Sequence, residues 1–217
     1  MLKKIVLTLS AVAVSSLSGL AFAVPIAGLV NTGAGFANNA LDTNYALTVT
    51  SGTTIAGSYG YVSDGIGFPD ASPWLPGNAT SEWLTPTANE AQSFDPTSNG
   101  VYRWRLTFNI DAMYDPATAY FVARWSTDNN GFVFLNDHVL FQSASSGFGS
   151  WSEFAVNSGF VTGTNTLDFY VTNLAQGPDN PTGVRVEFLD SNVPEPGTLA
   201  LLGMAMAGLG LRRRKAA

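Results

Sequence analysis

The sequence predicts an all-β fold, an antiparallel two-sheet sandwich of the jelly-roll type, and three observations support this. Residues 101–110 alternate between apolar and polar side chains, which is the pattern of a half-buried strand. Other short runs of this kind are separated by Gly, Pro, Asn and Asp. No stretch of the body keeps a helical period. Nine short strands in one segment indicate two antiparallel sheets packed face to face.

The expected strands follow one another along the chain with turn residues between them. They lie at residues 45–50, 58–62, 101–110, 118–125, 131–135, 138–141, 151–156, 166–172 and 183–189. In the run 101–110, Trp104 falls on the apolar face and is expected in the core, while Arg103 and Arg105 fall on the polar face. The alternation therefore predicts one buried side and one outer side for this strand.

Two connections between the expected strands have recognisable chemistry. Residues 132–135 and 138–141 flank the pair Asn136-Asp137, a length that favours a type I′ hairpin turn with positive φ at both central residues. Asparagine adopts this conformation readily, whereas Asp137 should carry a small strain relative to glycine. The long connection 64–100 is rich in Pro and Trp, and we expect an ordered loop that covers one end of the sandwich.

The N-terminal end differs from the body. Residues 1–23 begin with two lysines near the start, continue with an apolar run over 5–20, and end in Ala21-Phe22-Ala23, which fits the small-x-small cleavage rule. This is the pattern of a secretory signal peptide that signal peptidase removes after Ala23. A buried first strand, or an anchor helix that stays in place, is the alternative.

The C-terminal end combines three features in sequence. They are the element Val193-Pro194-Glu195-Pro196, an apolar stretch at 198–211, and the basic residues Arg212, Arg213, Arg214 and Lys215. The prolines exclude a helix through Glu195, so an apolar helix would begin after them and leave an extended peptide exposed. A transmembrane helix over 197–211 would be about 22 Å long against a hydrocarbon core of about 30 Å, so it is a marginal span. The arginines would keep the C-terminus in the cytoplasm.

This tail resembles the PEP-CTERM sorting signal of Gram-negative bacteria. The resemblance implies that an exosortase, a membrane cysteine transpeptidase, cuts near Pro194-Glu195-Pro196 after the tail has entered the inner membrane. It also implies an exported protein of a bacterium that makes an extracellular polysaccharide, with the cell surface or extracellular matrix as its destination.

Residues 24–192, between these ends, contain no charge run, linker or internal repeat, and we expect one domain. The chain is thereby divided into 1–23, 24–192 and 193–217. The middle segment has no lysine and sets four arginines against fifteen acidic residues, a net charge of −11. Nucleic acid and anionic lipid are therefore poor partners, and neutral sugars or cations fit better. An acidic surface that keeps a secreted protein soluble is the alternative explanation.

The residue inventory excludes several kinds of chemistry. The chain has no cysteine, which excludes disulfides, thiolate metal sites and a cysteine nucleophile. His138 is the single histidine, and no Gly-x-Ser-x-Gly motif accompanies it, which argues against a serine-hydrolase triad. A glycosidase needs only two suitably spaced carboxylates, but no pair is distinguished by its neighbours. We therefore expect a protein that is not an enzyme and that has no cofactor other than calcium.

The candidate calcium site is the run Asp128-Asn129-Asn130-Gly131, which offers oxygen ligands in a tight turn. Asp128 and Asn130 would be the metal ligands, and Asp128 and Asn129 are also candidates for ligand binding. The alternative is an Asx turn in which Asp128 accepts a hydrogen bond from its own local backbone.

Two further residues are candidates for ligand binding. Trp74 lies between Pro73 and Leu75 in the long loop, where an exposed ring could stack on a sugar or anchor the loop. Arg185 lies between two valines, so it should face away from the core, or pair with an acid such as Asp128 if that side is covered.

The body has a resemblance of its own, to β-sandwich modules similar to galactose-binding-like jelly rolls that precede PEP-CTERM tails. It rests on short motifs in a fixed order, among them Trp83-Leu84-Thr85-Pro86, Trp125-Ser126-Thr127-Asp128-Asn129, Gly163-Thr164-Asn165-Thr166-Leu167 and Asn180-Pro181-Thr182-Gly183. The sequence departs from the pattern at Asp137, where an Asn-Gly turn is usual. The resemblance implies the sandwich fold and a noncatalytic role.

These observations together predict a secreted, exosortase-sorted protein that acts outside the cell. Its expected role is that of a structural or carbohydrate-associating component of the envelope or exopolysaccharide matrix. A lectin-like module with a defined sugar site is the first alternative, and a secreted polysaccharide hydrolase is the second. Extracellular polysaccharide is the expected binding partner, besides the processing enzymes.

Overall fold

A computed structural model describes residues 23–64, 74–142 and 147–194, and these residues form an antiparallel β structure with two short 3-10 helices. The strands are β1 (Ala23–Val24), β2 (Leu41–Ser51), β3 (Tyr59–Ser63), β4 (Trp83–Thr85), β5 (Gly100–Ile110), β6 (Tyr120–Asp128), β7 (Asn130–Leu135), β8 (His138–Gln142), β9 (Ser152–Val156), β10 (Gly163–Asn173) and β11 (Gly183–Pro194). The 3-10 helices are η1 (Pro116–Thr118) and η2 (Gly147–Gly149). The predicted all-β antiparallel fold is thereby confirmed.

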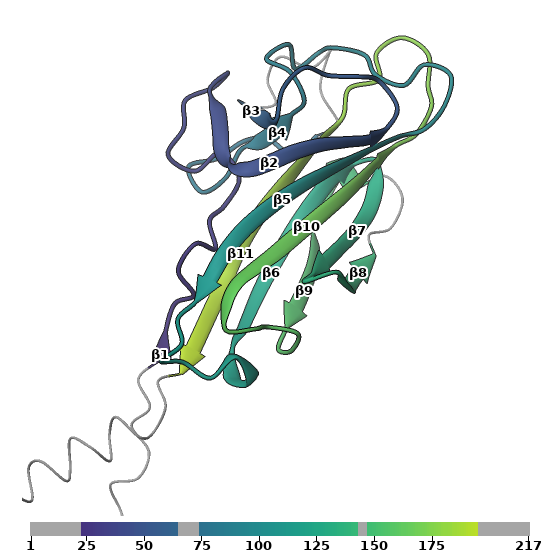
Figure 1. Cartoon of the computed structure of the whole chain (residues 1–217). Helices are drawn as coiled ribbons and strands as arrows, with labels where there is room; N and C mark the ends of the chain where they lie inside the picture. The colour runs from purple at the N-terminus through teal and green to yellow at the C-terminus, as the bar shows by residue number, and fades with distance from the viewer. Residues whose placement is uncertain (1–22, 65–73, 143–146, 195–217) are drawn as a thin grey trace, which may run out of the picture.

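The strands form one continuous sheet that folds over on itself into two layers (Figure 1). Strands β8, β7, β10, β5 and β2 follow one another in the first layer, and β4, β11, β6 and β9 follow one another in the second. Strand β3 links the layers because it pairs with both β2 and β4. Each layer therefore has an inner side that faces the other layer and an outer side.

The core lies between the two layers and is built by alternation along each strand. In β5 the residues at 102, 104, 106, 108 and 110 are buried, while Arg103, Arg105, Thr107 and Asn109 are partly or fully exposed. Trp104 is fully buried, as its apolar face predicts. Trp125 on β6 is also fully buried and lies 5.7 Å, between ring centroids, from Phe169 on β10, so the two layers meet through aromatic contacts.

All nine predicted strands are present, and the structure adds two short ones that the sequence pattern did not reveal. Strand β4 lies inside the segment that was expected to be a loop from 64 to 100, and all three of its residues are buried. A fully buried segment of three residues has no alternation to recognise. The hairpin between β7 and β8 is confirmed, since φ is 49° at Asn136 and 66° at Asp137.

The two ends of the described chain meet at one end of the sandwich, where β1 pairs with the last residues of β11 (Figure 1). Ala23 is opposite Pro194, and Val24 is opposite Val193. Val193 is 3% exposed and belongs to the hydrophobic core. The predicted body of residues 24–192 therefore ends inside β11, and Val193, just beyond it, still contributes to the core.

Several predicted features lie outside the described residues. They are the signal-peptide run with Ala21, and the tail with Glu195, Pro196, the apolar stretch, Arg212, Arg213 and Arg214. Within residues 23–64, 74–142 and 147–194, no helix has the length and apolar character needed to cross a membrane. The predicted helix at 197–211 lies outside these ranges.

Candidate functional site

The outer side of the first layer carries two rows of side chains that run across neighbouring strands. In one row, Arg105 on β5 is opposite Asp168 on β10, which is opposite Phe134 on β7. In the next row, Arg103 is opposite Tyr170, which is opposite Phe132. We call this surface the open face and define it by Arg103, Arg105, Phe132, Phe134, Asp168 and Tyr170.

The polar half of the open face is a guanidinium–carboxylate cluster. Arg105 donates from Nε to Asp168 Oδ1 at 2.7 Å and from Nη2 to Oδ2 at 2.6 Å, which is a bidentate pair. Arg103 Nε lies 3.9 Å from Asp168 Oδ1, and its Nη2 donates to Thr48 Oγ1 at 3.2 Å. The hydrogen bond to Asp168 raises the pKa of Arg105 above its usual value.

Exposure differs sharply within this cluster. The Asp168 side chain is 2% exposed, whereas those of Arg103 and Arg105 are 28% and 30% exposed. A guanidinium has five N–H donors, and the carboxylate engages only part of this set on Arg105. The two arginines therefore present donors to solvent from side chains that Asp168 holds in place.

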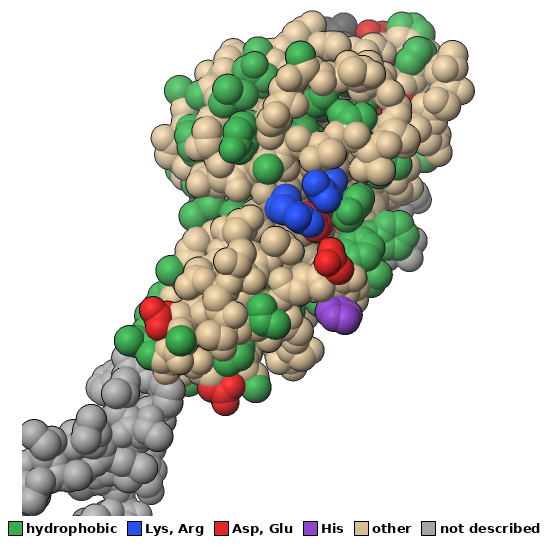
Figure 2. Space-filling model, viewed as in Figure 1, with side chains coloured by type: hydrophobic (Ala, Val, Ile, Leu, Met, Phe, Trp, Pro, Cys, Tyr) green, Lys and Arg blue, Asp and Glu red, His purple; other side chains and the backbone are tan. Residues whose placement is uncertain are grey.

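The apolar half of the open face consists of three aromatic rings beside the arginines. The Phe134 and Tyr170 centroids are 5.2 Å apart with an interplanar angle of 66°, and the Phe132 and Phe134 centroids are 6.4 Å apart with an angle of 55°. Phe132 is 38% exposed, which is unusual for a large ring on a regular strand. Figure 2 shows the basic side chains of this face next to a group of hydrophobic side chains.

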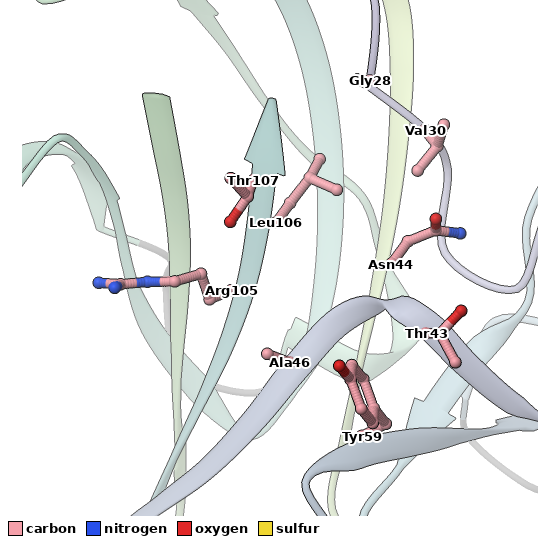
Figure 3. Close-up of a pocket in the computed structure, with 9 residues that line it drawn as sticks. All are labelled: Gly28, Val30, Thr43, Asn44, Ala46, Tyr59, Arg105, Leu106 and Thr107. Atoms are coloured by element: carbon pink, nitrogen blue, oxygen red, sulfur yellow. The ribbon is translucent and has the colours of Figure 1, made fainter. Parts of the chain in front are cut away.

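A hollow of about 310 Å³ adjoins the open face at Arg105. It lies between the segment that carries Gly28 and Val30, the start of β2, and β5 (Figure 3). Thr43, Asn44 and Tyr59 supply polar groups to its wall. Figure 3 shows the Arg105 guanidinium directed away from Asn44, so it serves the open face more than the hollow.

The outer side of the second layer also carries arginines and a carboxylate, and it is covered at Arg185, which is 1% exposed, while the Arg124 side chain is 30% exposed. Arg124 Nη2 lies 2.6 Å from Glu187 Oε2, and Arg185 Nη2 lies 3.4 Å from Glu187 Oε1. Ser81 receives a hydrogen bond from Arg185 Nε and donates one to Glu187, both at 2.7 Å. We call Arg124, Trp151, Arg185 and Glu187 the covered face, and residues 74–82 the covering segment.

Burial sets the electrostatics of the covered face. Arg185 is 1% exposed, and its burial lowers the pKa of the guanidinium. Burial alone would raise the pKa of Glu187, but hydrogen bonds from Ser81 and Arg124 and both guanidinium charges outweigh it and lower that pKa. The Trp151 ring has Arg124 Cζ at 4.5 Å and Arg185 Cζ at 4.9 Å from its centroid, which adds cation–π attraction. Arg185 thus pairs with an acid on a covered side, as one of the two predicted alternatives stated, and the acid is Glu187 instead of the suggested Asp128.

Trp74 anchors the covering segment from the inside. It is 5% exposed, its centroid lies 4.1 Å from that of Trp83, and its Nε1 donates to Asp128 Oδ2 at 2.9 Å. A Cβ added at Gly183 would lie 2.8 Å from the Trp74 ring, so only glycine fits beneath it. Of the two predicted roles of Trp74, the structure has the loop anchor and not the exposed stacking ring, because Trp83 and Asp128 hold it against the sandwich.

The carboxyl group of Asp128 is buried at the end of β6. Burial raises its pKa to about 7, and the hydrogen bond from Trp74 opposes that rise. Its backbone carbonyl accepts a hydrogen bond from Thr182 Oγ1 at 2.6 Å. The carboxyl group meets an indole 54 residues away in sequence, so the local Asx turn is replaced by a long-range contact.

The next two residues of the predicted calcium run, Asn129 and Asn130, are held by contacts with the backbone of other segments. Asn129 Oδ1 accepts a hydrogen bond from the Leu174 amide at 2.7 Å, and Asn130 begins β7 opposite Thr172. Among the described residues, no group of three or more Asp, Glu and His side chains is placed to hold a metal ion. Calcium binding by Asp128 and Asn130 stays a prediction.

The predicted ligand-binding residues and the open face lie in different parts of the molecule. Trp74 belongs to the covering segment and is buried, and Asp128 and Arg185 are buried in contact with that segment. None of the three is part of the open face. The outward direction of Arg103 and Arg105 was visible in the sequence. Phe132 and Phe134 were not recognisable as outer residues, because they alternate with Val133 and Leu135, which are equally apolar.

Comparisons with solved structures give only distant likenesses. A family 35 carbohydrate-binding module from Paenibacillus barcinonensis aligns at 16% identity over 67% of this chain and 93% of its own, with a TM-score of 0.31. A β-glucuronidase of glycoside hydrolase family 2 aligns at 16% identity over 69% of this chain and 17% of its own, with a TM-score of 0.37. A β-glucosidase from Kluyveromyces marxianus in complex with glucose aligns at 10% identity over 42% of this chain and 10% of its own, with a TM-score of 0.29.

The sequence comparisons concern the C-terminal end. No curated protein sequence matches the chain. Residues 192–215 match the model of the PEP-CTERM protein-sorting motif, which implies export and sorting at a membrane. The motif begins inside β11, at Asn192 opposite Tyr120, so its residues 192–194 belong to the last strand of the sandwich. The chain carries a PEP-CTERM sorting motif that begins in the last strand of an antiparallel β body.

Proposed function

We propose that the protein is an exported, exosortase-processed β-sandwich without catalytic activity. It works outside the cell as a structural or carbohydrate-associating component of the envelope or exopolysaccharide matrix. The sorting motif at residues 192–215 carries this proposal, because it requires export and passage through a membrane-linked processing step.

The pairing of β1 with β11 supports the proposal geometrically. Both ends of the body leave the sandwich at the same place, with Val24 opposite Val193 (Figure 1). A signal peptide before Val24 and a sorting helix after Pro194 would therefore reach the membrane from one end of the sandwich. The open face lies on the outer side of the first layer and would remain accessible during this step.

The same pairing limits where the processing enzyme acts. Val193 is buried in the core and Pro194 is held in β11, so neither presents an extended free peptide. A protease cleaves segments that leave the folded body. Cleavage is therefore expected after Pro194, and the mature protein keeps all of β11.

Fractionation of the producing bacterium tests the sorting. In an exosortase-deficient strain, the protein should stay in the inner membrane at a larger mass than the processed form. Replacing Pro194-Glu195-Pro196 should have the same effect, because the helix still inserts but lacks its recognition peptide. Neutral residues at Arg212, Arg213 and Arg214 should instead cause misinsertion, since they remove the charge that keeps the C-terminus inside. Unchanged size and location in the exosortase-deficient strain would show that the tail is a plain anchor.

A glycan array with the full-length chain, run with and without calcium, tests the carbohydrate association. Binding to one defined oligosaccharide would favour the lectin-like alternative. The hydrolase alternative predicts reducing ends released from a soluble polysaccharide. Within the open face, Asp168 is the single carboxyl group and Arg105 engages both of its oxygens, whereas a glycosidase uses two free carboxyl groups.

A further inference from the structure

We infer that the open face binds a single soluble chain of a neutral polysaccharide, with sugar rings on Phe132, Phe134 and Tyr170 and hydroxyl groups on the two arginines. The inference rests on the proposed carbohydrate association and names its site and ligand class. The site lies on the flat side of the β5, β10 and β7 strands and uses none of the residues around Trp74, Asp128 and Arg185.

The aromatic rings give the first argument. A sugar ring has an apolar side that packs on an aromatic surface, and the Phe132 ring is 38% exposed beside the partly exposed rings of Phe134 and Tyr170. The interplanar angles of 55° and 66° mean that the rings do not share one plane. A crystalline polysaccharide surface needs a flat platform, whereas a single flexible chain can follow tilted rings. The geometry therefore favours a soluble chain.

The arginines give the second argument. Sugar hydroxyls need hydrogen-bond donors and acceptors at fixed positions next to the ring contacts. Arg105 is fixed by its bidentate contact with Asp168 and still has unused donors at 30% exposure. Arg103 lies one row away, opposite Tyr170, with its side chain 28% exposed. The donors on β5 thus lie beside the rings on β10 and β7.

Charge gives the third argument and selects a neutral ligand. Arg103 and Arg105 face Asp168, and Asp137 in the adjacent hairpin turn also acts electrostatically on Arg105. The local charge is therefore close to balanced, while the segment 24–192 carries a net charge of −11. An acidic polymer would gain little attraction from the balanced charges of the site and would be repelled by the acidic surface around it. The binding of a neutral polymer does not depend on either effect.

The size of the face fits more than one sugar unit. The row from Thr48 through Arg103 and Tyr170 to Phe132 crosses four adjacent strands, which corresponds to about 14 Å at the usual spacing between strands. The hollow at Tyr59 and Asn44 extends this surface beyond Arg105. An extended chain can therefore contact the rings and the guanidinium groups at the same time.

Binding of the full-length chain, purified in mild detergent from a host without exosortase, tests the inference. The probes are a soluble neutral β-glucan, a soluble galactan, microcrystalline cellulose and alginate, each at low and high salt. We expect binding to a soluble neutral polysaccharide that is insensitive to salt, because it does not depend on screened charges. Phe132→Ala and Tyr170→Ala should each weaken it about ten-fold. Leu189→Ala, at an exposed apolar position on β11, is the matched control and should bind as the wild type does.

The other outcomes overturn the inference in different ways. Binding to alginate alone, with loss in salt, would exclude the neutral ligand, and binding to cellulose alone would exclude the single soluble chain. Wild-type binding by both aromatic variants would exclude the open face, and the proposed function would stand. A change from dimer to monomer in Phe132→Ala would assign the face to a second copy of the chain. If no polysaccharide binds while fractionation still shows exosortase-dependent sorting, the proposed carbohydrate association is wrong and the proposed sorting stands. Thermal unfolding of each variant confirms that it is folded.

Discussion

The open face and the covered face use the same ionic chemistry and differ in whether a segment packs over one of the arginines. Each has two arginines beside a nearly buried carboxylate, with contacts of 2.6 Å for Arg105–Asp168 and for Arg124–Glu187, and in both pairs the arginine side chain is 30% exposed. On the second layer, residues 74–82 cover this chemistry and bury Arg185 to 1% exposure. On the first layer nothing among the described residues covers it. The second arginine therefore fixes a segment at the covered face, whereas both arginines of the open face keep part of their surface exposed.

The aromatic neighbours of the two faces differ in the same way. Trp151 lies against both guanidinium groups of the covered face, at 4.5 and 4.9 Å, so its ring is used inside the protein. The rings of the open face contact one another, Phe134 and Tyr170 edge to face and Phe132 and Phe134 at a tilt, and leave part of their surface to solvent. An exposed aromatic group beside exposed donors costs solubility without adding stability. This difference points to recognition at the open face and to stability at the covered face.

The largest expected effect is a difference in unfolding free energy between an arginine variant of the covered face and one of the open face. Arg185→Ala should destabilise the protein by about 3–5 kcal/mol, because it leaves Glu187 and Ser81 buried with fewer partners. Arg103→Ala should cost less than about 1 kcal/mol, because its ion pair is long and partly exposed. Urea unfolding of both variants measures the contrast. Equal losses would show that covering does not distinguish the faces.

The anchor of the covering segment should give the next largest effect. Trp74→Phe keeps a ring against Trp83 but removes the donor to Asp128, and we expect a loss of about 1–3 kcal/mol. Limited proteolysis should then cut near residues 74–82 faster than in the wild type. Phe134→Leu on the open face is the control for a changed ring and should leave this cleavage rate unaltered.

Asp128 predicts a pH dependence of stability at the same anchor. Its pKa is about 7 in the folded protein against 3.8 for an unperturbed group, so the folded state binds the proton more tightly. The stability that it contributes is therefore fully present below about pH 4 and is lost as the pH rises toward about 7. Asp128→Asn keeps an oxygen for Trp74 and removes the titration. The wild type should lose stability relative to this variant across that range, and parallel curves of unfolding free energy against pH would contradict the assignment.

The smallest effect concerns the hairpin beside the open face. Asp137 has a φ of 66°, which glycine adopts without cost, so Asp137→Gly should stabilise the protein by a few tenths of a kcal/mol, up to about 1 kcal/mol. The change also removes one negative charge near Arg105. Thermal unfolding measures the gain, and a decrease in stability would mean that the Asp137 side chain has a favourable role in the turn.

The sequence alone determined the features that depend on local pattern. Alternation in residues 101–110 predicted the buried side of β5, and the pair Asn136-Asp137 predicted a turn whose φ angles the structure shows as positive. The tail was recognisable because Pro194-Glu195-Pro196, an apolar stretch and a basic cluster are contiguous, and residues 192–215 match the sorting motif. Such features need no information about which strands become neighbours.

Only the tertiary structure decided which surfaces are covered. The sequence offers the same alternation around Arg185 as around Arg105, but the first is buried by Ser81 and Pro76, more than 100 residues earlier. The loop sequence left Trp74 either exposed or an anchor, and contacts with Asp128 and Trp83 make it an anchor; Phe132 lies in a strand that is apolar on both sides, and it is exposed on the outer one. Burial of an outer side chain depends on what packs over its strand, and a strand's own sequence carries only the alternation between its two sides.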